Sequence, residues 1–382
     1  LGMSRGLGDV YKRQIKFHEP FESKNTKKYL EEVIKRNSYN DNYFTERCYD
    51  LLSEFYQTKN LLLTHSGTAA LEMSAMLLHE SNHELKQEPV IKLPSYTFSS
   101  TANAFLRSNF DISFLDVNAD DMILDSVEYQ KLKDNEFLVN VNYANSTFDY
   151  PQSYNHKLIE DAAQSFGVTY NKQPVGTFGR YGCISFHPTK NLHAGYGGLI
   201  IIKDNEEFEL AKTIWERGTD RNKVISGQKN KYEWVSLGSS FQINELSASV
   251  LLSQLEEEST IRNVREEIYH TYKNILEDIE LAEYMTTQKV NPKVSPNYHA
   301  YYIILKNNRD NFIEFMSKNG IQTYIGYENL HSSYFGKKNG LDSKLPITDK
   351  LSPNLVRLPL HTGLKIDDVK YVCKKIREYF RL

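Results

Sequence analysis

The chain has 382 residues, a formal net charge of −3 and three cysteines, so its length suits a large domain plus a smaller one rather than one simple core. Acidic and basic residues are interspersed and no apolar run is long enough to cross a bilayer, which argues against nucleic-acid and membrane partners. Cys48, Cys183 and Cys373 are widely spaced and form no CxxC pair, so disulfide and zinc scaffolds are disfavoured and a cytoplasmic protein is expected.

Residues 1–14 lack the apolar core of a signal peptide, and we expect a disordered or non-native leader there. An apolar-faced helix over 244–258 followed by a charged helix through Tyr272 is typical of a connector between domains. We therefore predict a large domain over 15–255 and a small C-terminal domain over 256–382.

Short apolar runs separated by helical patterns predict βα units and a mostly parallel sheet flanked by helices, which is the α/β class. The predicted strands are 61–63, 90–94, 112–116, 138–142, 158–161, 182–186 and 199–202. Beyond the connector, a strand at 300–305, a helix at 310–318 and a closing amphipathic helix at 367–380 predict a smaller α+β domain.

The first strand runs into His-Ser-Gly-Thr-Ala-Ala-Leu at 65–71, a glycine-containing turn before a helical pattern. The backbone amides of Gly67 and Thr68, together with the Thr68 hydroxyl, would point at an anion such as a phosphate, aided by the helix dipole. An ordinary helix cap made by Ser or Thr is the alternative.

A second strand-to-helix junction, Leu-Pro-Ser-Tyr-Thr-Phe-Ser-Ser-Thr-Ala-Asn at 93–103, brings Tyr96 and Phe98 to the same edge of the predicted sheet. Either aromatic ring could stack on a flat ligand. Packing in the core is the alternative for both.

Asp161 lies at the carboxyl end of the strand at 158–161, within Glu-Asp-Ala-Ala-Gln. That end of an open α/β sheet faces the ligand crevice, where a carboxylate could hold a pyridinium nitrogen protonated. Because Asp before Ala-Ala is also a good helix start, an N-cap is the alternative.

Lys190 lies between a buried strand and a glycine-rich turn, in Ser-Phe-His-Pro-Thr-Lys-Asn at 185–191. A lysine that is partly desolvated there would present a neutral amine near physiological pH, able to form a Schiff base. A solvated surface lysine is the alternative, and a packed, hydrogen-bonded histidine is expected at His187.

In this order, the four segments resemble the DegT/DnrJ/EryC1/StrS family of sugar-nucleotide aminotransferases, from about Ile15 to the C-terminus. The resemblance implies a fold-type I enzyme that uses pyridoxal 5′-phosphate. It implies that Lys190 binds the cofactor and moves the proton, that Asp161 contacts the pyridine nitrogen, that Gln164 lies near the phenolic oxygen, and that Phe98 stacks on the ring. The phosphate site would comprise Gly67, Thr68 and Ser185, with Gln242 reaching the phosphate of a partner subunit, and the substrate side would include Arg221, Tyr327 and His331.

Three further segments, at 215–222, 231–234 and 238–240, are similar to a subgroup that aminates a dTDP-linked 4-keto-6-deoxyhexose. The resemblance also implies an amino-acid donor, glutamate, and a homodimer with shared active sites. Alternatives are an aminotransferase for another nucleotide sugar, a sugar dehydratase, in which histidine replaces the lysine, and a non-catalytic sugar-nucleotide-binding or regulatory protein.

Four positions depart from the family pattern: Asn142 and Asn145 replace a histidine and a turn glycine, Tyr196 replaces a glutamate, and Gln242 replaces an asparagine. Asparagine adopts left-handed turns readily, so we expect the turn at Asn145 to survive. At Gln242 the amide chemistry is kept, but its reach differs by one methylene.

Overall fold

The computed structural model describes residues 14–37, 39–81, 87–151 and 155–382. The predicted leader, 1–14, lies outside these ranges except for its last residue and stays a prediction. Within the described ranges, every helix is too short or too polar to span a bilayer.

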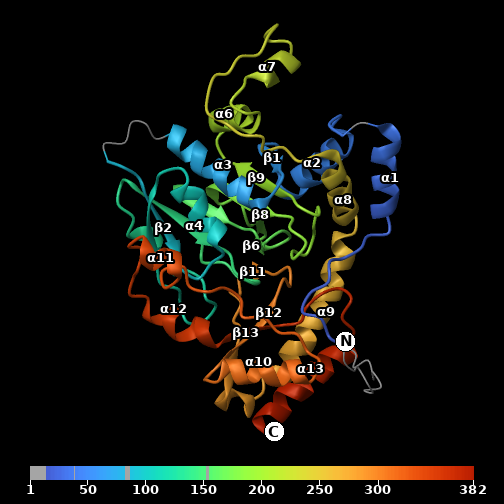
Figure 1. The fold of residues 1–382 in the computed structure, drawn as a ribbon, viewed down its shortest axis with the longest axis vertical. Helices are drawn as coiled ribbons and strands as arrows, with labels where there is room; N and C mark the ends of the chain where they lie inside the picture. Colours follow the sequence, from blue (N-terminus) through green and yellow to red (C-terminus); the bar gives the residue numbers. More distant parts are fainter. Residues whose placement is uncertain (1–13, 38, 82–86, 152–154) are drawn as a thin grey trace, which may run out of the picture.

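A seven-stranded mixed sheet forms the centre of the molecule, in the order β1-β9-β8-β5-β4-β2-β3 (Figure 1). Its strands are β1 (Leu61–Thr64), β2 (Val90–Pro94), β3 (Asp111–Leu115), β4 (Glu136–Val141), β5 (Asn155–Asp161), β8 (Gly179–Ser185) and β9 (Gly198–Ile202). The neighbours from β3 to β8 pair in parallel, and β9 is antiparallel to both β8 and β1. The predicted α/β class is confirmed, and all seven predicted strands are present with ends shifted by at most three residues.

The two faces of this sheet bury separate hydrophobic cores because successive strand residues point to opposite sides. In β1, Leu61 and Leu63 pack in one core and Leu62 packs in the other. Helices cover both faces, as expected for parallel strands. They are α1 (Thr26–Arg36), α2 (Tyr43–Tyr56) and α8 (Glu245–Leu255) on the first core, and α3 (Gly67–Glu80), α4 (Ser99–Leu106) and α6 (Asn205–Trp215) on the second.

A smaller antiparallel sheet, β10-β12-β13, lies below the large sheet in Figure 1 and has its own core. Helix α9 (Glu258–Leu276) runs from α8 toward it, and Ile15 near the start of the chain packs in the same core and pairs with Ile321. This layer contains β10 (Met285–Thr287), β12 (Tyr301–Leu305), β13 (Leu355–Leu358), α10 (Arg309–Lys318) and α13 (Ile366–Phe380). The remaining elements are α5 (Val127–Gln130), β6 (Thr169–Tyr170), β7 (Gln173–Pro174), α7 (Arg221–Ile225), η1 (Leu281–Glu283), β11 (Val294–Ser295), α11 (Tyr334–Lys338), α12 (Pro346–Leu351) and η2 (Ser352–Asn354).

The adjacent acids at the end of β5 point to opposite sides of the sheet and do different work. Glu160 is fully buried and accepts hydrogen bonds from the backbone N–H groups of Gly176, Phe178 and Gly179, at 2.7–2.8 Å, and from the Tyr150 hydroxyl, at 2.6 Å. Burial raises the pKa of this carboxyl, while the four hydrogen bonds oppose that shift. Glu160 therefore holds the turn that enters β8, whereas Asp161 faces the other way.

We expect Glu160→Ala to lower the free energy of unfolding by about 3–5 kcal/mol, because it leaves several buried N–H groups without an acceptor. Urea titration followed by circular dichroism measures this change. As the control, Glu31→Ala removes an exposed carboxylate and should change stability by less than about 0.5 kcal/mol. Equal stability of the two variants would contradict this role for Glu160.

Candidate active site

A cavity of about 640 Å³ opens at the carboxyl ends of β4, β5 and β8, walled on the other side by segments at 299–300, 324–327 and 357–360. Parallel strands of an open sheet deliver their following loops to one edge, which explains why residues distant in sequence meet there. Eight of the residues predicted to form the site line this cavity. They are Gly67, Thr68, Phe98, Asp161, Gln164, Ser185, Lys190 and Tyr327.

Lys190 lies in the loop after β8, where its backbone N–H donates to the His187 carbonyl at 2.8 Å. Its side chain is half-buried and faces the cavity. Burial lowers the pKa of Lys190 to about 8, the charge of Asp161 opposes that shift, and the charge of Arg357 adds to it. A substantial fraction of the amine is therefore neutral, and nucleophilic, near pH 8.

Asp161 ends β5, and its carboxylate is buried beneath the cavity. Oδ2 accepts from the Thr101 hydroxyl at 2.7 Å, and Oδ1 accepts from the Ala163 N–H at 3.2 Å. Burial raises the pKa of Asp161, opposed by these two hydrogen bonds and by the charge of Lys190. Residues 162–168, all described, form turns rather than a helix, so the alternative of a helix N-cap is wrong.

The N-terminus of α3 meets the end of β8 at the cavity edge. Ser66 caps the helix by accepting from the Ala69 N–H at 3.0 Å, and the Thr68 hydroxyl lies 2.9 Å from that of Ser100. A Cβ on Gly67 would lie 2.7 Å from the Cβ of Ser185, so only glycine allows this close approach. The cap and the anion site are thus compatible, because the first turn of α3, the hydroxyls of Thr68 and Ser100 and the positive helix end meet at the cavity.

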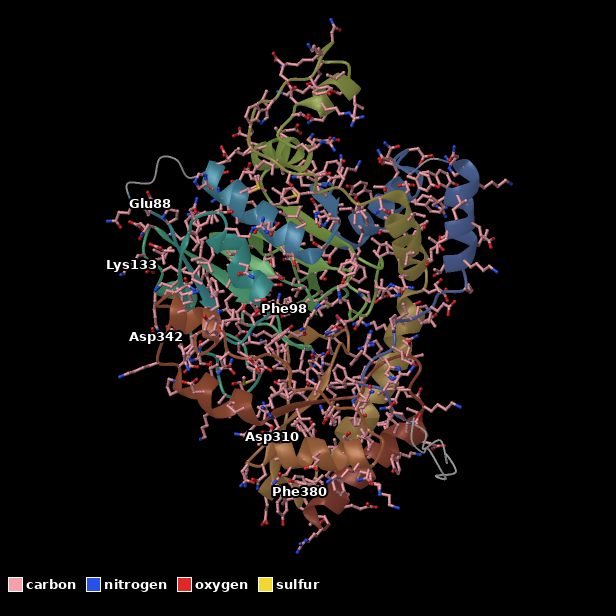
Figure 2. All side chains as sticks on the ribbon, in the orientation of Figure 1. Glu88, Phe98, Lys133, Asp310, Asp342 and Phe380 are labelled. Atoms are coloured by element: carbon pink, nitrogen blue, oxygen red, sulfur yellow. The ribbon has the colours of Figure 1, made fainter. Side chains whose placement is uncertain are left out.

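Aromatic side chains from the two walls approach each other in the cavity. Phe98 is 60% exposed and its ring centroid lies 6.3 Å from that of Tyr327, whereas Tyr96 is buried, so the core alternative applies to Tyr96 alone. Figure 2 shows Phe98 at the end of α4 nearest the C-terminal layer. Gln164 joins the two walls, accepting from the Ala144 N–H at 2.9 Å and donating to the Tyr327 hydroxyl at 2.5 Å.

The other three predicted site residues lie outside this cavity. Gln242 donates to Glu216 at 2.5 Å, and Arg221 is exposed on α7, 4.0 Å from the same carboxylate. His331 is buried, with Nδ1 2.6 Å from the Ser95 hydroxyl and Nε2 3.0 Å from Asp349. A role for these residues at a shared site stays a prediction.

The side chains of Asn142 and Asn145, which differ from the family pattern, form hydrogen bonds within the structure. The left-handed residue of the turn is Ala144, with φ 56°, and not Asn145 as expected. The Asn145 side chain instead accepts from the His299 N–H and donates to the Ala300 carbonyl, both at 2.6 Å, because an amide provides one donor and one acceptor. The Asn142 side-chain oxygen, Oδ1, accepts from the Asn140 side-chain amide at 2.7 Å and from the Thr147 hydroxyl.

Tyr196 and His187 lie together at the cavity mouth, with ring centroids 5.0 Å apart in an edge-to-face arrangement. His187 Nδ1 lies 2.9 Å from the Thr189 hydroxyl, which agrees with the hydrogen-bonded histidine expected from the sequence. Tyr196 is 64% exposed, so the position that departs from the family's glutamate presents an aromatic ring at the opening.

Several lining residues were missed by the sequence analysis. Ser100 and Thr101 belong to a segment already singled out for its aromatics, and their place at the helix start was an available signal. His18, His299 and Arg357 carried no such signal, because they come from segments far from Lys190 in the chain. Burial lowers the pKa of His18 to about 4 and also lowers that of His299, so both imidazoles are neutral at pH 7.

These residues fit a flat, phosphorylated pyridine aldehyde. The helix end and hydroxyls at Thr68 and Ser100 suit the phosphate, Phe98 suits the ring face, and Lys190 suits the aldehyde. The buried Asp161, whose charge is disfavoured by burial, suits a protonated ring nitrogen that would stabilise it.

The comparisons with known proteins agree with this fit. The chain is 28% identical over 300 residues to a pleiotropic regulatory protein of Geobacillus stearothermophilus, covering 75% of this chain and 77% of that one. It is 24% identical over 388 residues to GDP-perosamine synthase of Vibrio cholerae, covering 96% and 99%. The solved structure of Helicobacter pylori PseC, an aminotransferase involved in pseudoaminic acid biosynthesis, superposes with a TM-score of 0.85 at 21% identity, covering 97% of this chain and all of that one.

The fold and the cavity define a fold-type I aminotransferase, as the sequence predicts. Residues 20–377 match the DegT/DnrJ/EryC1/StrS aminotransferase family, and the chain belongs to it. The predicted cofactor, pyridoxal phosphate, is confirmed by this family and by a similar solved structure, the PLP form of Spr1654 from Streptococcus pneumoniae. That structure superposes with a TM-score of 0.83 at 20% identity, covering 96% of this chain and 98% of that one.

We expect pyridoxal phosphate to attach to the cofactor-free protein faster as pH rises, with a midpoint near 8, because only the neutral amine of Lys190 reacts. Stopped-flow visible absorbance measures the rate. Lys190→Ala should remove the absorbance of the covalently bound cofactor, and Lys203→Ala, which changes an exposed lysine at the end of β9, should leave it unchanged. A midpoint above 10 would mean that the amine is not desolvated.

Proposed function

We propose that this aminotransferase moves an amino group from L-glutamate to a nucleotide-linked 4-keto-6-deoxyhexose, with dTDP-4-keto-6-deoxy-D-glucose giving dTDP-4-amino-4,6-dideoxy-D-galactose. The observation that carries the proposal is the meeting of Lys190, Asp161 and the helix end at Gly67 in one cavity. The relatives support the sugar class, since one is named GDP-perosamine synthase and another a UDP-4-amino-4,6-dideoxy-N-acetyl-β-L-altrosamine transaminase. The choice of dTDP and of this sugar rests on the segments at 215–222, 231–234 and 238–240.

When bound, pyridoxal phosphate supplies the carbonyl that carries the amino group and the electron-withdrawing ring that stabilises charge on carbon. The helix end at Gly67 and Thr68 would bind the phosphate, and the Phe98 ring would stack on the pyridine ring. Asp161 would keep a proton on the ring nitrogen, its own carboxylate fixed by Thr101 at 2.7 Å.

Lys190 would do the proton transfers. Its Nζ is a base when neutral, and a pKa of about 8 makes both protonation states available near neutral pH. It would take a proton from the α-carbon of the donor in the first half-reaction and deliver one to the sugar carbon in the second. Gln164, fixed between Ala144 and Tyr327, would orient the cofactor's phenolic oxygen.

We also propose a homodimer in which residues 217–240 reach the partner's site. This arm extends beyond the sheet at α7 (Figure 1). Large apolar side chains on it are exposed: Ile225 by 74%, Trp234 by 77% and Leu237 by 64%. A patch of this kind is costly in water unless another surface covers it, and Arg221 on the same arm would then face the partner's substrate.

Other assignments differ in what they require of the cavity. A sugar dehydratase would lack the lysine, which is present here as Lys190. A non-catalytic regulatory protein is suggested only by the name of one relative, and it would not need a desolvated amine. An aminotransferase for another nucleotide sugar would keep every residue of the cofactor site and differ only in the acceptor.

To test the reaction, the cofactor-loaded protein is mixed with glutamate and then with dTDP-4-keto-6-deoxyglucose. Visible absorbance should fall with glutamate and return with the keto-sugar, and mass spectrometry should find the aminosugar. Loss without return would keep the aminotransferase and exclude this sugar, whereas no response to any amino acid would contradict amino transfer.

Asp161→Asn should slow both half-reactions by roughly 100- to 1,000-fold, because it removes the charge that stabilises the protonated ring nitrogen but keeps an acceptor for Thr101. Single-turnover absorbance measures each half-reaction. The control Asp342→Asn alters an exposed carboxylate that does not line the cavity and should have no effect. A less than threefold change in Asp161→Asn would remove Asp161 from the cofactor site.

Trp234→Glu should weaken the dimer, because it places a charge within the apolar arm. Light scattering measures the mass in solution, with Ile279→Glu as the control, since Ile279 is 88% exposed and lies far from the arm. Dimeric wild type with monomeric Trp234→Glu is the expected outcome. A wild type that is monomeric yet transfers amino groups would contradict the shared site.

A further inference from the structure

Residues 15–21, here called the N-terminal strap, run between the C-terminal layer and the loop at 186–197, here called the lysine loop. At one end of the strap, Ile15 packs in the core of the C-terminal layer and pairs with its backbone. At the other end, the Phe21 carbonyl lies 2.9 Å from Nε2 of His193, and because a carbonyl oxygen only accepts, this nitrogen carries the proton. The strap therefore connects the C-terminal layer to the lysine loop by direct contacts.

His18, in the middle of the strap, forms a second contact with the lysine loop. Its Nε2 lies 2.7 Å from the Pro188 carbonyl oxygen, so Nε2 carries the proton and donates. Burial lowers the pKa of His18 to about 4, the bond to Pro188 opposes that shift, and the charges of Arg265 and Arg357 add to it. The imidazole is therefore neutral at pH 7, and its single N–H group is used to hold the lysine loop.

The residue before His18 fixes the position of the strap. The Phe17 N–H donates to Oε1 of Gln322 at 3.1 Å, and the Phe17 ring stacks on that of Tyr324 with centroids 5.3 Å apart. Both partners belong to the C-terminal part of the chain. Movement of the strap along the lysine loop would break these contacts, so His18 is presented to the loop in one position.

The bond from His18 acts close to Lys190. Pro188 precedes Lys190 by two residues, and the Lys190 N–H closes a tight turn over this stretch by donating to the His187 carbonyl at 2.8 Å. After the lysine, the Asn191 amide donates to a backbone carbonyl, so its oxygen accepts from Nδ1 of His299 at 2.9 Å. Lys190 thus lies between two anchored residues, one on each side.

The place of this loop determines how reactive the lysine is. Burial is the largest cause of the lowered pKa of Lys190, so a loop that moves toward water would return the amine to its charged form. His18 also lines the same cavity, where its ring occupies wall area that water would otherwise reach. The strap can therefore influence the amine without touching it.

We propose that His18 is a positioning residue, which holds the lysine loop through the Pro188 carbonyl in the place where the Lys190 amine is desolvated and reactive. This rests on the proposed function, in which Lys190 carries the cofactor and transfers protons. Two substitutions separate the hydrogen bond from the volume of the ring. His18→Phe keeps a ring but has no N–H donor, whereas His18→Gln carries an amide N–H at about the position of Nε2.

The first test measures the lysine in the cofactor-free protein. Trace acetic anhydride acylates each lysine in proportion to its neutral fraction, so mass spectrometry over a series of pH values gives the pKa of Lys190. The midpoint, near 8 in the wild type, should rise by about one pH unit in His18→Phe and return to within about 0.3 units of the wild type in His18→Gln. The exposed Lys203 should be labelled equally in all three proteins.

Hydrogen–deuterium exchange of the peptide that contains residues 186–193 gives a second readout without turnover. Exchange should be roughly tenfold faster in His18→Phe than in the wild type and His18→Gln, because the loop opens more often. His270→Phe alters a half-exposed imidazole on α9, outside the cavity, and should behave as the wild type.

The half-reactions distinguish positioning from substrate contact. Because Lys190 acts in both, His18→Phe should lower the maximal rates with glutamate and with the keto-sugar, each by roughly tenfold. The concentrations that give half-maximal rates should stay within about twofold of the wild type. A change in the half-saturating concentration of one substrate, with labelling of Lys190 unchanged, would make His18 a substrate-binding residue and overturn the proposal.

Two further outcomes would overturn it: wild-type labelling and exchange in His18→Phe, or a folded His18→Gln that behaves like His18→Phe. Circular dichroism establishes folding, and His18→Asn, whose amide lies nearer the position of Nδ1, replaces His18→Phe if that variant does not fold. Labelling of Lys190 that responds to His18 in a protein whose cofactor attaches to another lysine would contradict the proposed function alone, because labelling needs no cofactor.

Discussion

Two opposite charges at the ends of neighbouring parallel strands are the constraint on which this structure depends. Asp161 ends β5, and Lys190 lies in the loop after β8, the strand that pairs with β5. Each charge is costly in a buried setting, and each lowers that cost for the other by Coulombic attraction. The same setting makes the lysine amine available as a nucleophile and base, so the energetic cost and the chemistry have one origin.

The C-terminal segments complete the site by direct contacts with the large sheet. Asn191 is next to Lys190, and its side-chain oxygen Oδ1 lies 2.9 Å from Nδ1 of His299, while its side-chain amide donates to the Asn297 carbonyl at 2.7 Å. Asn297 in turn donates to the Gln164 and Phe166 carbonyls, both at 2.8 Å. The loop that carries the lysine is therefore held by the segment before β12, which also lines the cavity at His299 and Ala300.

The cofactor side of the site could be predicted from sequence because its signals are local. A strand followed by a small polar turn recurs at Gly67, Phe98 and Asp161, with a helix start at the first two, and topology brings such junctions to one edge. Two local inferences failed for a physical reason: turns follow Asp161 rather than a helix, and Ala144 rather than Asn145 takes the left-handed conformation. In both places tertiary hydrogen bonds outweigh residue preference.

The residues of the C-terminal wall, and those that lie outside the cavity, could not be placed in the same way. Arg357 belongs to β13, a four-residue strand without a distinctive pattern, and its place opposite Lys190 depends on the pairing of β13 with β12. Arg221 and Gln242 lie outside the cavity that the described residues line, and both contact Glu216 instead. Long-range pairing and assembly leave no mark within a short window of sequence.

The most direct test of this account is to load the protein with pyridoxal phosphate, reduce it with borohydride and map the modified peptide by mass spectrometry. The account predicts one phosphopyridoxyl group, carried by Lys190, and none in Lys190→Ala. A label on another lysine, or no label under conditions where the cofactor binds, would contradict the claim that the paired charges at the ends of β5 and β8 form the catalytic centre.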